Sequence, residues 1–273
     1  MSLGSTIKSA RLEQQKSQKQ IAFGICSQSM LSAIENDHYL PNAKLMLALC
    51  QRLKIDLNQL CLAANFAISD QDTVNTTISD LCNHHLYQVL KTFLQQPQTL
   101  AAIETDAQTQ AYYYYLGIAE FQTASSLISA HQNLKLAVNL IPPIQQLSAL
   151  SRLCLVSLAL ILVRDNQHQS VTDLIRRALT GIKEAPFEAD LNVVFYLAAL
   201  INFDLGKYQV ATDYLGTGIK FATAHDSHYM LANDYRLLAE IAAVQGQRHE
   251  QLMDLDHQKF LVSLFHEKVN EHF

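Results

Sequence analysis

Apolar residues recur at intervals of three and four along most of the chain, which is the spacing of one face of an α-helix. Beyond residue 67 glycine is rare, and the few prolines separate the apolar segments. The pattern therefore predicts an all-α protein. In the first part of the chain it predicts five short helices, at residues 3–16, 18–23, 28–36, 43–53 and 57–66. The inner positions expected for the first helix are Ile7, Ala10 and Leu12.

The helices predicted at 18–23 and 28–36 form a helix-turn-helix. Ser17 and Ser27 can cap their N-termini, and Gly24 permits the bend between them. The apolar residues whose spacing turns them inward are Ile21, Ala22, Leu31 and Ile34. The second helix then turns short polar side chains outward, and we expect it to lie in the major groove of DNA.

Residues beyond 67 contain a weak repeat with a period of about 40 residues. The segment at 204–215 matches the turn Gly-x-Tyr-x-x-Ala of a tetratricopeptide repeat, with Gly206, Tyr208 and Ala211 in place. Equivalent turns are expected at Ala124, Asn166 and Gly246. One helical pair cannot bury its apolar face alone, so four stacked pairs, with a degenerate fifth pair at 72–96, predict a superhelix with a concave inner wall.

Residues 4–60 resemble the Cro/C1-type (XRE) helix-turn-helix family. The matching positions are Arg11, Ser17, Gln18, Ser32, Glu35 and Pro41. The turn is one residue shorter than in most phage repressors, and in this form the segment resembles the Rgg/PlcR-type peptide-pheromone receptors of Gram-positive bacteria. The resemblance implies a five-helix lambda-repressor-like domain at 1–66 and a right-handed, tetratricopeptide-like superhelix at 67–273 that binds a peptide and dimerises. It also implies a structural salt bridge between Arg11 and Glu35.

The charges are distributed unevenly between the two predicted domains. Residues 1–66 contain seven Lys or Arg and four Asp or Glu, a net charge of +3, so the remainder carries −8 of the total of −5. A basic head on an acidic body suits a protein that presents its head to phosphates. The sequence contains no run of 18 uncharged apolar residues, no signal peptide and no CxxC pair among its five cysteines. We therefore expect a cytoplasmic protein with reduced thiols and no membrane span.

Polar residues of the helix-turn-helix are the candidates for DNA contact. Gln28 can form two hydrogen bonds with adenine, and it is the best single candidate for reading a base. Ser29 and Ser32 can donate to or accept from several bases, and Ala33 can contact a thymine methyl group. The expected phosphate contacts are Gln18, Lys19, Asn36 and Lys44. The alternative is that these residues are ordinary solvated side chains of a helix surface.

The first helix of each predicted pair should line the concave wall of the repeat domain. By the register of the repeat, the inward positions are Tyr114, Ile118, Phe121, Val156, Leu160, Arg164, Tyr196, Leu200, Phe203, Asn233, Arg236 and Glu240. Such a wall suits a short hydrophobic peptide, with Asn233 available to its amides and Arg236 or Arg164 to its C-terminal carboxylate. The alternative is that the aromatic residues only pack against neighbouring helices.

Motifs of catalysis and cofactor binding are absent from the sequence, which contains no HExxH, no glycine-rich nucleotide loop and no Gly-x-Ser-x-Gly. The histidines lack the further ligands that a metal needs. We therefore expect no enzyme, no cofactor and no metal, but a quorum-sensing transcription regulator. It would bind an inverted-repeat operator in double-stranded DNA as a homodimer, under the control of a short hydrophobic oligopeptide. Two alternatives stay open, a DNA-tethered scaffold for a partner protein and a ligand-free repressor whose repeats only dimerise.

Overall fold

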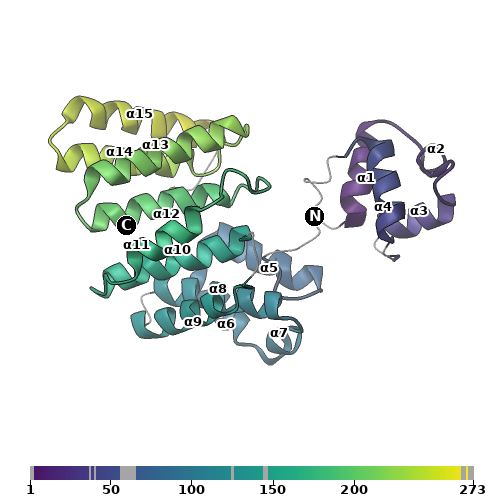
Figure 1. Ribbon diagram of the computed structural model, residues 1–273, viewed down its shortest axis with the longest axis horizontal. Helices are drawn as coiled ribbons and strands as arrows, with labels where there is room; N and C mark the ends of the chain where they lie inside the picture. Colours follow the sequence, from purple (N-terminus) through teal and green to yellow (C-terminus); the bar gives the residue numbers. More distant parts are fainter. Residues whose placement is uncertain are drawn as a thin grey trace. The chain divides into compact units, whose positions relative to one another are not determined.

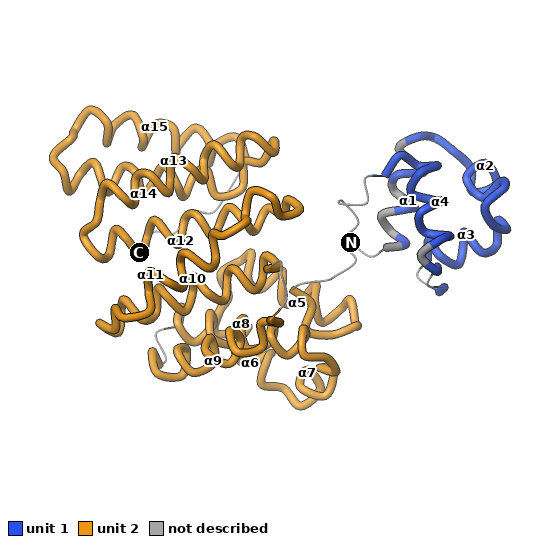
Figure 2. The backbone as a smooth tube through the Cα atoms, in the orientation of Figure 1, with its two compact units in different colours: residues 1–64 blue, residues 65–273 orange. Residues whose placement is uncertain are grey.

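The computed structural model of the protein describes residues 3–36, 38–39, 41–55, 66–123, 126–143, 147–265 and 269. Within these ranges every regular element is a helix and none is a strand, as the sequence predicts. The chain divides into two compact units, which we call the N-terminal unit (Met1–Ala64) and the C-terminal unit (Asn65–Phe273) (Figure 2). No helix in the described part of the chain is both long and apolar enough to cross a membrane.

The described part of the N-terminal unit contains the helices α1 (Leu3–Glu13), α2 (Gln18–Ala22), α3 (Gln28–Glu35) and α4 (Ala43–Leu53) (Figure 1). Each corresponds to a predicted helix. The first helix ends before the predicted residue 16, because Gln15 adopts the left-handed conformation with φ of 53°. The fifth predicted helix, at 57–66, falls almost entirely outside the described residues.

Apolar residues from all four helices form one core. Its buried members are Ile7, Ile21, Ala22, Leu31, Ile34, Met46, Leu49, Cys50 and Leu53. The inner positions predicted for the helix-turn-helix are therefore confirmed. The prediction for Leu12 was wrong, because its side chain is 56% exposed. Leu12 follows the buried Ile7 by five residues, which is about 140° around the helix, so both cannot face the same core.

The helix-turn-helix is defined locally by its caps. The Ser17 hydroxyl accepts from the backbone N–H of Gln20 at 3.2 Å, and the Gln20 side chain accepts from the Ser17 N–H at 2.8 Å. The Ser27 hydroxyl accepts from the N–H of Met30 at 3.1 Å. Gly24 has φ of +74° at the bend, a conformation that costs glycine little. Both caps and the bend lie where the sequence predicts them.

The C-terminal unit is a stack of helices (Figure 1). They are α5 (Asp72–Asn83), α6 (Tyr87–Leu94), α7 (Pro97–Ala101), α8 (Asp106–Gln122), α9 (Leu127–Asn139), α10 (Ala149–Arg164), α11 (Val171–Leu179), α12 (Leu191–Asp204), α13 (Tyr208–Ala224), α14 (Leu231–Val244) and α15 (Arg248–Phe265). From α8 onward, consecutive helices pack in pairs, which are α8 with α9, α10 with α11, α12 with α13 and α14 with α15. The degenerate pair expected at 72–96 corresponds to α5 and α6.

The turns inside these pairs recur in one conformation. Asn166, Gly206 and Gly246 have φ of 58°, 70° and 72°, and each follows the first helix of its pair. Glycine and asparagine tolerate this left-handed conformation better than other residues do. Three of the four predicted turns are therefore confirmed in place, and the fourth, Ala124, lies outside the described residues.

Close contacts between helices hold the pairs together. A Cβ added to Gly218 of α13 would lie 2.8 Å from the Cβ of Phe195 on α12, and one added to Gly117 of α8 would lie 2.8 Å from Leu134 Cγ. The buried guanidinium of Arg152 donates to the carbonyl oxygens of Ala178 and Thr180, the latter at 2.9 Å. Arg152 thereby satisfies carbonyl groups at the end of α11 and ties that helix to α10.

Candidate functional site

The outward face of α3 carries the residues predicted to read bases. Gln28 and Ser29 are exposed, whereas Ser32 and Ala33 are partly buried. The Ser29 hydroxyl lies 3.0 Å from that of the cap Ser27, so its position is coupled to the start of the helix. Gln28 and Ser29 are consequently the members of this set most open to a partner.

A chain of hydrogen bonds runs from the core of the N-terminal unit to Gln28. Arg11 donates to both carboxylate oxygens of Glu35, with Nε at 2.6 Å and Nη2 at 2.9 Å. Glu35 accepts from Gln18 Nε2 at 2.8 Å, and Gln18 Oε1 accepts from Gln28 Nε2 at 3.1 Å. The salt bridge implied for Arg11 and Glu35 is therefore present. The Gln18 side chain, predicted to meet a phosphate, is bonded within the protein at both ends and orients Gln28.

The surroundings of Arg11 and Glu35 favour the charged forms of both side chains. Burial opposes ionisation of Glu35, but hydrogen bonds from Arg11 and Gln18 outweigh it and hold the pKa of Glu35 below its usual value. The hydrogen bond to Glu35 likewise raises the pKa of Arg11 against the effect of burial. The pair is buried, so the Glu35 carboxylate is held in place as the acceptor for the Gln18 side chain.

The remaining phosphate candidates lie at the surface. Lys19, Lys44 and Asn36 are exposed. The Asn36 amide donates to the Ser32 carbonyl at 2.8 Å and accepts from Lys8 Nζ at 3.5 Å. Lys8 therefore adds a cation that sequence reasoning did not assign to the site, since it comes from α1, a helix outside the helix-turn-helix.

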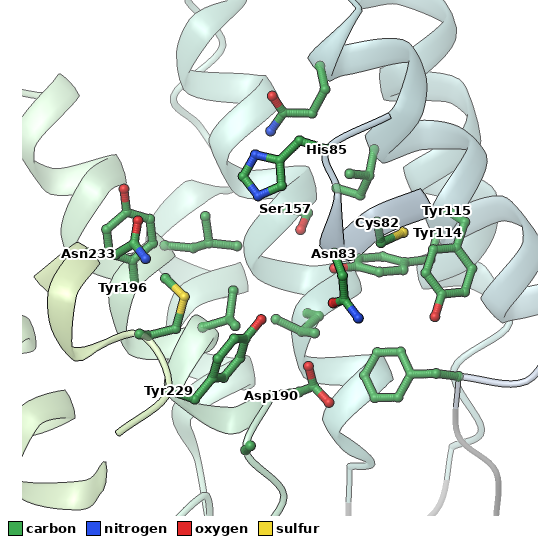
Figure 3. A pocket seen from close by; sticks show the side chains of 18 of the residues that line it. Cys82, Asn83, His85, Tyr114, Tyr115, Ser157, Asp190, Tyr196, Tyr229 and Asn233 are labelled. Carbon is green, nitrogen blue, oxygen red and sulfur yellow. The ribbon is translucent and has the colours of Figure 1, made fainter. Parts of the chain in front are cut away.

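The C-terminal unit contains a pocket of about 780 Å³ (Figure 3). It is lined by Phe66, Ser79, Cys82, Asn83, His84, His85, Tyr87, Tyr114, Tyr115, Ile118, Phe121, Gln122, Leu153, Ser157, Leu160, Ile161, Ala189, Asp190, Val193, Tyr196, Leu197, His228, Tyr229, Met230, Asn233 and Phe265. The wall thus combines α8, α10 and α12 with the ends of α5, α14 and α15. A volume of this size is in the range of pockets that hold small ligands or several residues of a peptide.

The pocket brings together half of the residues predicted for the concave wall. Those that line it are Tyr114, Ile118, Phe121, Leu160, Tyr196 and Asn233. Those that do not are Val156, Arg164, Leu200, Phe203, Arg236 and Glu240. Most of the second group follow the lining residues along the same helices, so in α10, α12 and α14 the pocket occupies an earlier stretch than the repeat register suggests.

Val156 shows why the register was hard to read. In α10 every residue from Ala149 to Val163 is buried, so no polar face marks the side that lines the pocket. The lining positions are Leu153, Ser157, Leu160 and Ile161, and Val156 lies in the core. A shift of one residue turns a side chain by about 100°, which exchanges Val156 for Ser157.

The arginines predicted to meet a carboxylate are paired with acids of the protein. Arg164 Nε lies 3.0 Å from Asp204 Oδ2, and its guanidinium stands 5.6 Å from the centre of the Phe121 ring. Arg236 Nε lies 3.2 Å from Glu240 Oε1. Neither arginine lines the pocket, so the structure does not offer them as free cations inside it.

Two hydroxyl groups in the pocket wall have no hydrogen-bond partner among the described residues. They are Ser157 Oγ and Tyr196 OH, on side chains whose residues are only 3% and 2% exposed. Burial raises the pKa of Tyr196, so it is a neutral hydroxyl at physiological pH. Because buried polar groups are nearly always satisfied, these two are candidates for contact with a ligand.

Asp190 is the pocket residue that sequence reasoning missed most clearly. It lies directly before α12, in a segment without helical periodicity, and no motif marks it. Burial raises the pKa of its carboxyl group, although a backbone hydrogen bond opposes the effect.

Among the described residues no group of His, Cys, Asp and Glu is arranged to hold a metal ion.

Comparison with known proteins agrees with both units. Residues 7–60 match the helix-turn-helix family HTH_3. Comparison with curated protein sequences found no significant match. The chain is similar to the solved structure of Bacillus thuringiensis PlcR in complex with the peptide PapR7 and DNA, with 16% identity, a TM-score of 0.66, and coverage of 97% of this chain and 96% of that chain.

Two further structures extend the likeness. The apo form of B. thuringiensis PlcR has 16% identity and a TM-score of 0.57, over 97% of this chain and 94% of that chain. ComR from S. thermophilus in complex with DNA and its signalling peptide ComS has 14% identity and a TM-score of 0.54, over 97% and 95%. At such identities the likeness shows a shared fold. Residues 7–60 therefore match the HTH_3 helix-turn-helix family, in a chain that has the fold of PlcR and ComR over nearly its whole length.

Proposed function

We propose that this protein is a cytoplasmic transcription regulator whose DNA binding is controlled by a short signalling peptide in the pocket of the C-terminal unit. The observation that carries the proposal is the pocket itself, an aromatic and aliphatic wall in which the hydroxyl groups of Ser157 and Tyr196 have no partner within the described part of the chain. Peptides supply backbone N–H and C=O groups at regular intervals, and those groups match such a wall. The solved complexes of PlcR and ComR with peptides support the same reading.

DNA recognition is assigned to the outward face of α3. Gln28 is held by Gln18, with its amide at the surface, where it can pair with the major-groove edge of adenine. Lys19, Lys44 and Asn36 are exposed for contacts to phosphates. The positive charge of residues 1–66 supplies the attraction that is independent of sequence.

We propose that two protomers bind one operator, through contacts between their C-terminal units. None of the residues of α15 is buried, and its exposed apolar side chains include Leu252, Met253, Phe260 and Leu264. A second copy covering this face would form a symmetric pair, which suits an inverted-repeat operator with half-sites about 34 Å apart. A partner protein on the same face would instead favour the scaffold alternative.

Peptide control follows if the dimer has two arrangements that differ in affinity for the operator. A peptide can shift that equilibrium only by as much as its own affinity differs between the arrangements. The pocket is lined by helices from several pairs, so its occupant contacts the elements whose relative packing would change.

The test is fluorescence anisotropy of the full chain with apolar peptides encoded by small reading frames beside its gene, followed by titration of operator DNA with and without peptide. Saturable peptide binding that changes DNA affinity supports the proposal. Specific DNA binding that no peptide changes, together with a dimer in solution, would favour the ligand-free repressor.

A further inference from the structure

The described wall of the pocket contains an acidic side chain but no lysine or arginine. Of the described residues that line it, Asp190 is the one carboxylic acid. The histidines in the wall are His84, His85 and His228. A ligand carboxylate inside this pocket would face an acid and find no permanent cation among the described residues, which is unfavourable against a mostly apolar wall.

Among the described residues the Asp190 carboxylate forms no ion pair, and its hydrogen-bond partner is a backbone N–H group. It occupies the N-cap position of α12, yet no side-chain hydrogen bond caps that helix. Figure 3 shows Asp190 in the pocket wall together with Tyr229, Tyr114 and Tyr115. A carboxylate beside aromatic rings is a suitable site for an ammonium group, which gains both an ion pair and cation–π contacts there.

We propose that the pocket binds its peptide with the free N-terminal ammonium group at Asp190, and with the C-terminal carboxylate outside the pocket. This inference rests on the proposed function and specifies the polarity of the ligand. An α-amino group has a pKa of about 7.7–8.0 and is largely protonated in the cytoplasm. The arginines that the sequence suggested for the carboxylate, Arg164 and Arg236, lie outside the wall and are already paired.

The hydroxyl groups of Ser157 and Tyr196 fit a peptide that runs in the same direction. Tyr196 follows Asp190 by six positions along α12, a rise of about 9 Å. An extended peptide advances about 3.3 Å per residue, so the backbone near its third residue reaches the level of Tyr196. Ser157 on α10 lines the same space and can bond an adjacent backbone group. The first three residues of the peptide would then be the ones held most firmly.

The experiment uses the full chain and a synthetic set of apolar heptapeptides of Leu, Ile, Val and Phe, labelled with fluorescein at the C-terminus. Each is prepared with a free N-terminus, with an acetylated N-terminus, and acetylated with one internal lysine. We expect acetylation to weaken binding at least tenfold and the lysine not to restore it. Asp190→Asn should weaken binding of the free-amine peptides similarly and remove their advantage over the acetylated ones.

The matched control is Asp204→Asn, an acid of the same helix that pairs with Arg164 outside the pocket. This variant should keep the full effect of acetylation. Equal binding of free and acetylated peptides by the wild-type protein would overturn the inference and leave the proposed function standing. Restoration by lysine would overturn the assignment to the N-terminus. Absence of binding by all three peptide forms would count against the proposed function itself. The acetylation comparison uses wild-type protein, so it does not depend on the folding of a variant.

Discussion

The N-terminal unit and the C-terminal unit hold their polar site residues in different environments. On α3, Gln28 is exposed to water and is also bonded to Gln18, so it has partners before DNA arrives. In the pocket, Ser157 Oγ and Tyr196 OH are buried and have no partner among the described residues. Binding at the first site exchanges existing hydrogen bonds for new ones, whereas binding at the second supplies bonds that the free protein lacks. The α3 face should therefore favour specificity for its DNA site, and the pocket should favour affinity for its ligand.

The largest effect is expected from Arg11→Ala, which removes one partner of a buried ion pair. The change leaves the carboxylate of Glu35 buried with Gln18 as its one side-chain donor among the described residues, and such losses cost about 3–5 kcal/mol. The N-terminal unit should lose stability and DNA binding, while peptide binding in the C-terminal unit should persist. Hydrogen exchange resolved by unit measures the loss of stability in each unit, and anisotropy titrations measure DNA and peptide binding. Equal loss of protection in the two units would contradict the expectation that they unfold independently.

The next effect is expected from Gln28→Ala, which removes the proposed base contact from an exposed position. Sequence-specific DNA binding should weaken by about 1–3 kcal/mol, with no change in stability. Gln18→Ala should cost less DNA affinity, about 0.5–1.5 kcal/mol, because it removes the hydrogen bond that orients Gln28 and leaves Gln28 itself in place. It also removes a donor to the buried Glu35 carboxylate, so a loss of stability accompanies it. Anisotropy titrations of the operator and of an unrelated duplex distinguish specific from non-specific loss. Unchanged discrimination in Gln28→Ala would remove this residue from the site.

Tyr196→Phe tests whether the buried Tyr196 hydroxyl contributes to peptide binding and not to the stability of the free protein. Removing a buried hydroxyl without a partner should leave the peptide-free protein as stable as before, or more stable by up to about 1 kcal/mol. Peptide binding should weaken by about 1 kcal/mol, roughly fivefold. Chemical unfolding with and without peptide gives both numbers. As the control, Tyr214→Phe changes a partly buried tyrosine outside the pocket and should leave peptide affinity unchanged.

The smallest effect is a difference in the response of the two units to acid. The pKa of Glu35 is lowered in the folded protein, so its stabilising contribution is present at neutral pH and is lost as pH falls through the folded pKa. The pKa of Asp190 is raised, so its contribution is absent at neutral pH and appears as pH falls through the folded pKa. The free energy of local unfolding, measured by hydrogen exchange from pH 7 to about 3, should fall with acid around Glu35 and rise with acid around Asp190. Asp190→Asn should remove the rise.

The sequence predicts the helix-turn-helix closely because its determinants are local. Ser17, Ser27 and Gly24 act within a few residues of their own positions, and the apolar spacing marks the inner face of each helix. The turns at Asn166, Gly206 and Gly246 are predictable for the same reason, since their backbone conformation favours particular residue types.

The pocket is less predictable because its wall depends on packing between distant segments. In α10 both faces are buried, so periodicity cannot separate the face toward the pocket from the face toward the core. Asp190 lies in an irregular connection, where the sequence contains no periodic signal. The network from Arg11 to Gln28 was visible only in part, because a side-chain bond between Gln18 and Gln28 depends on how α2 and α3 cross.

The equal spacing of Asn166, Gly206 and Gly246 makes the connections between helices interchangeable. Deleting the residues from 167 to 206 would join one left-handed turn to the start of an equivalent helix, leaving the chain one pair shorter with its periodicity intact. Duplication at the same points would lengthen the stack by one pair. Gene rearrangements of this size can therefore alter the width of a ligand site in a single step, by adding or removing a whole wall segment such as α12, without first passing through point changes in the core.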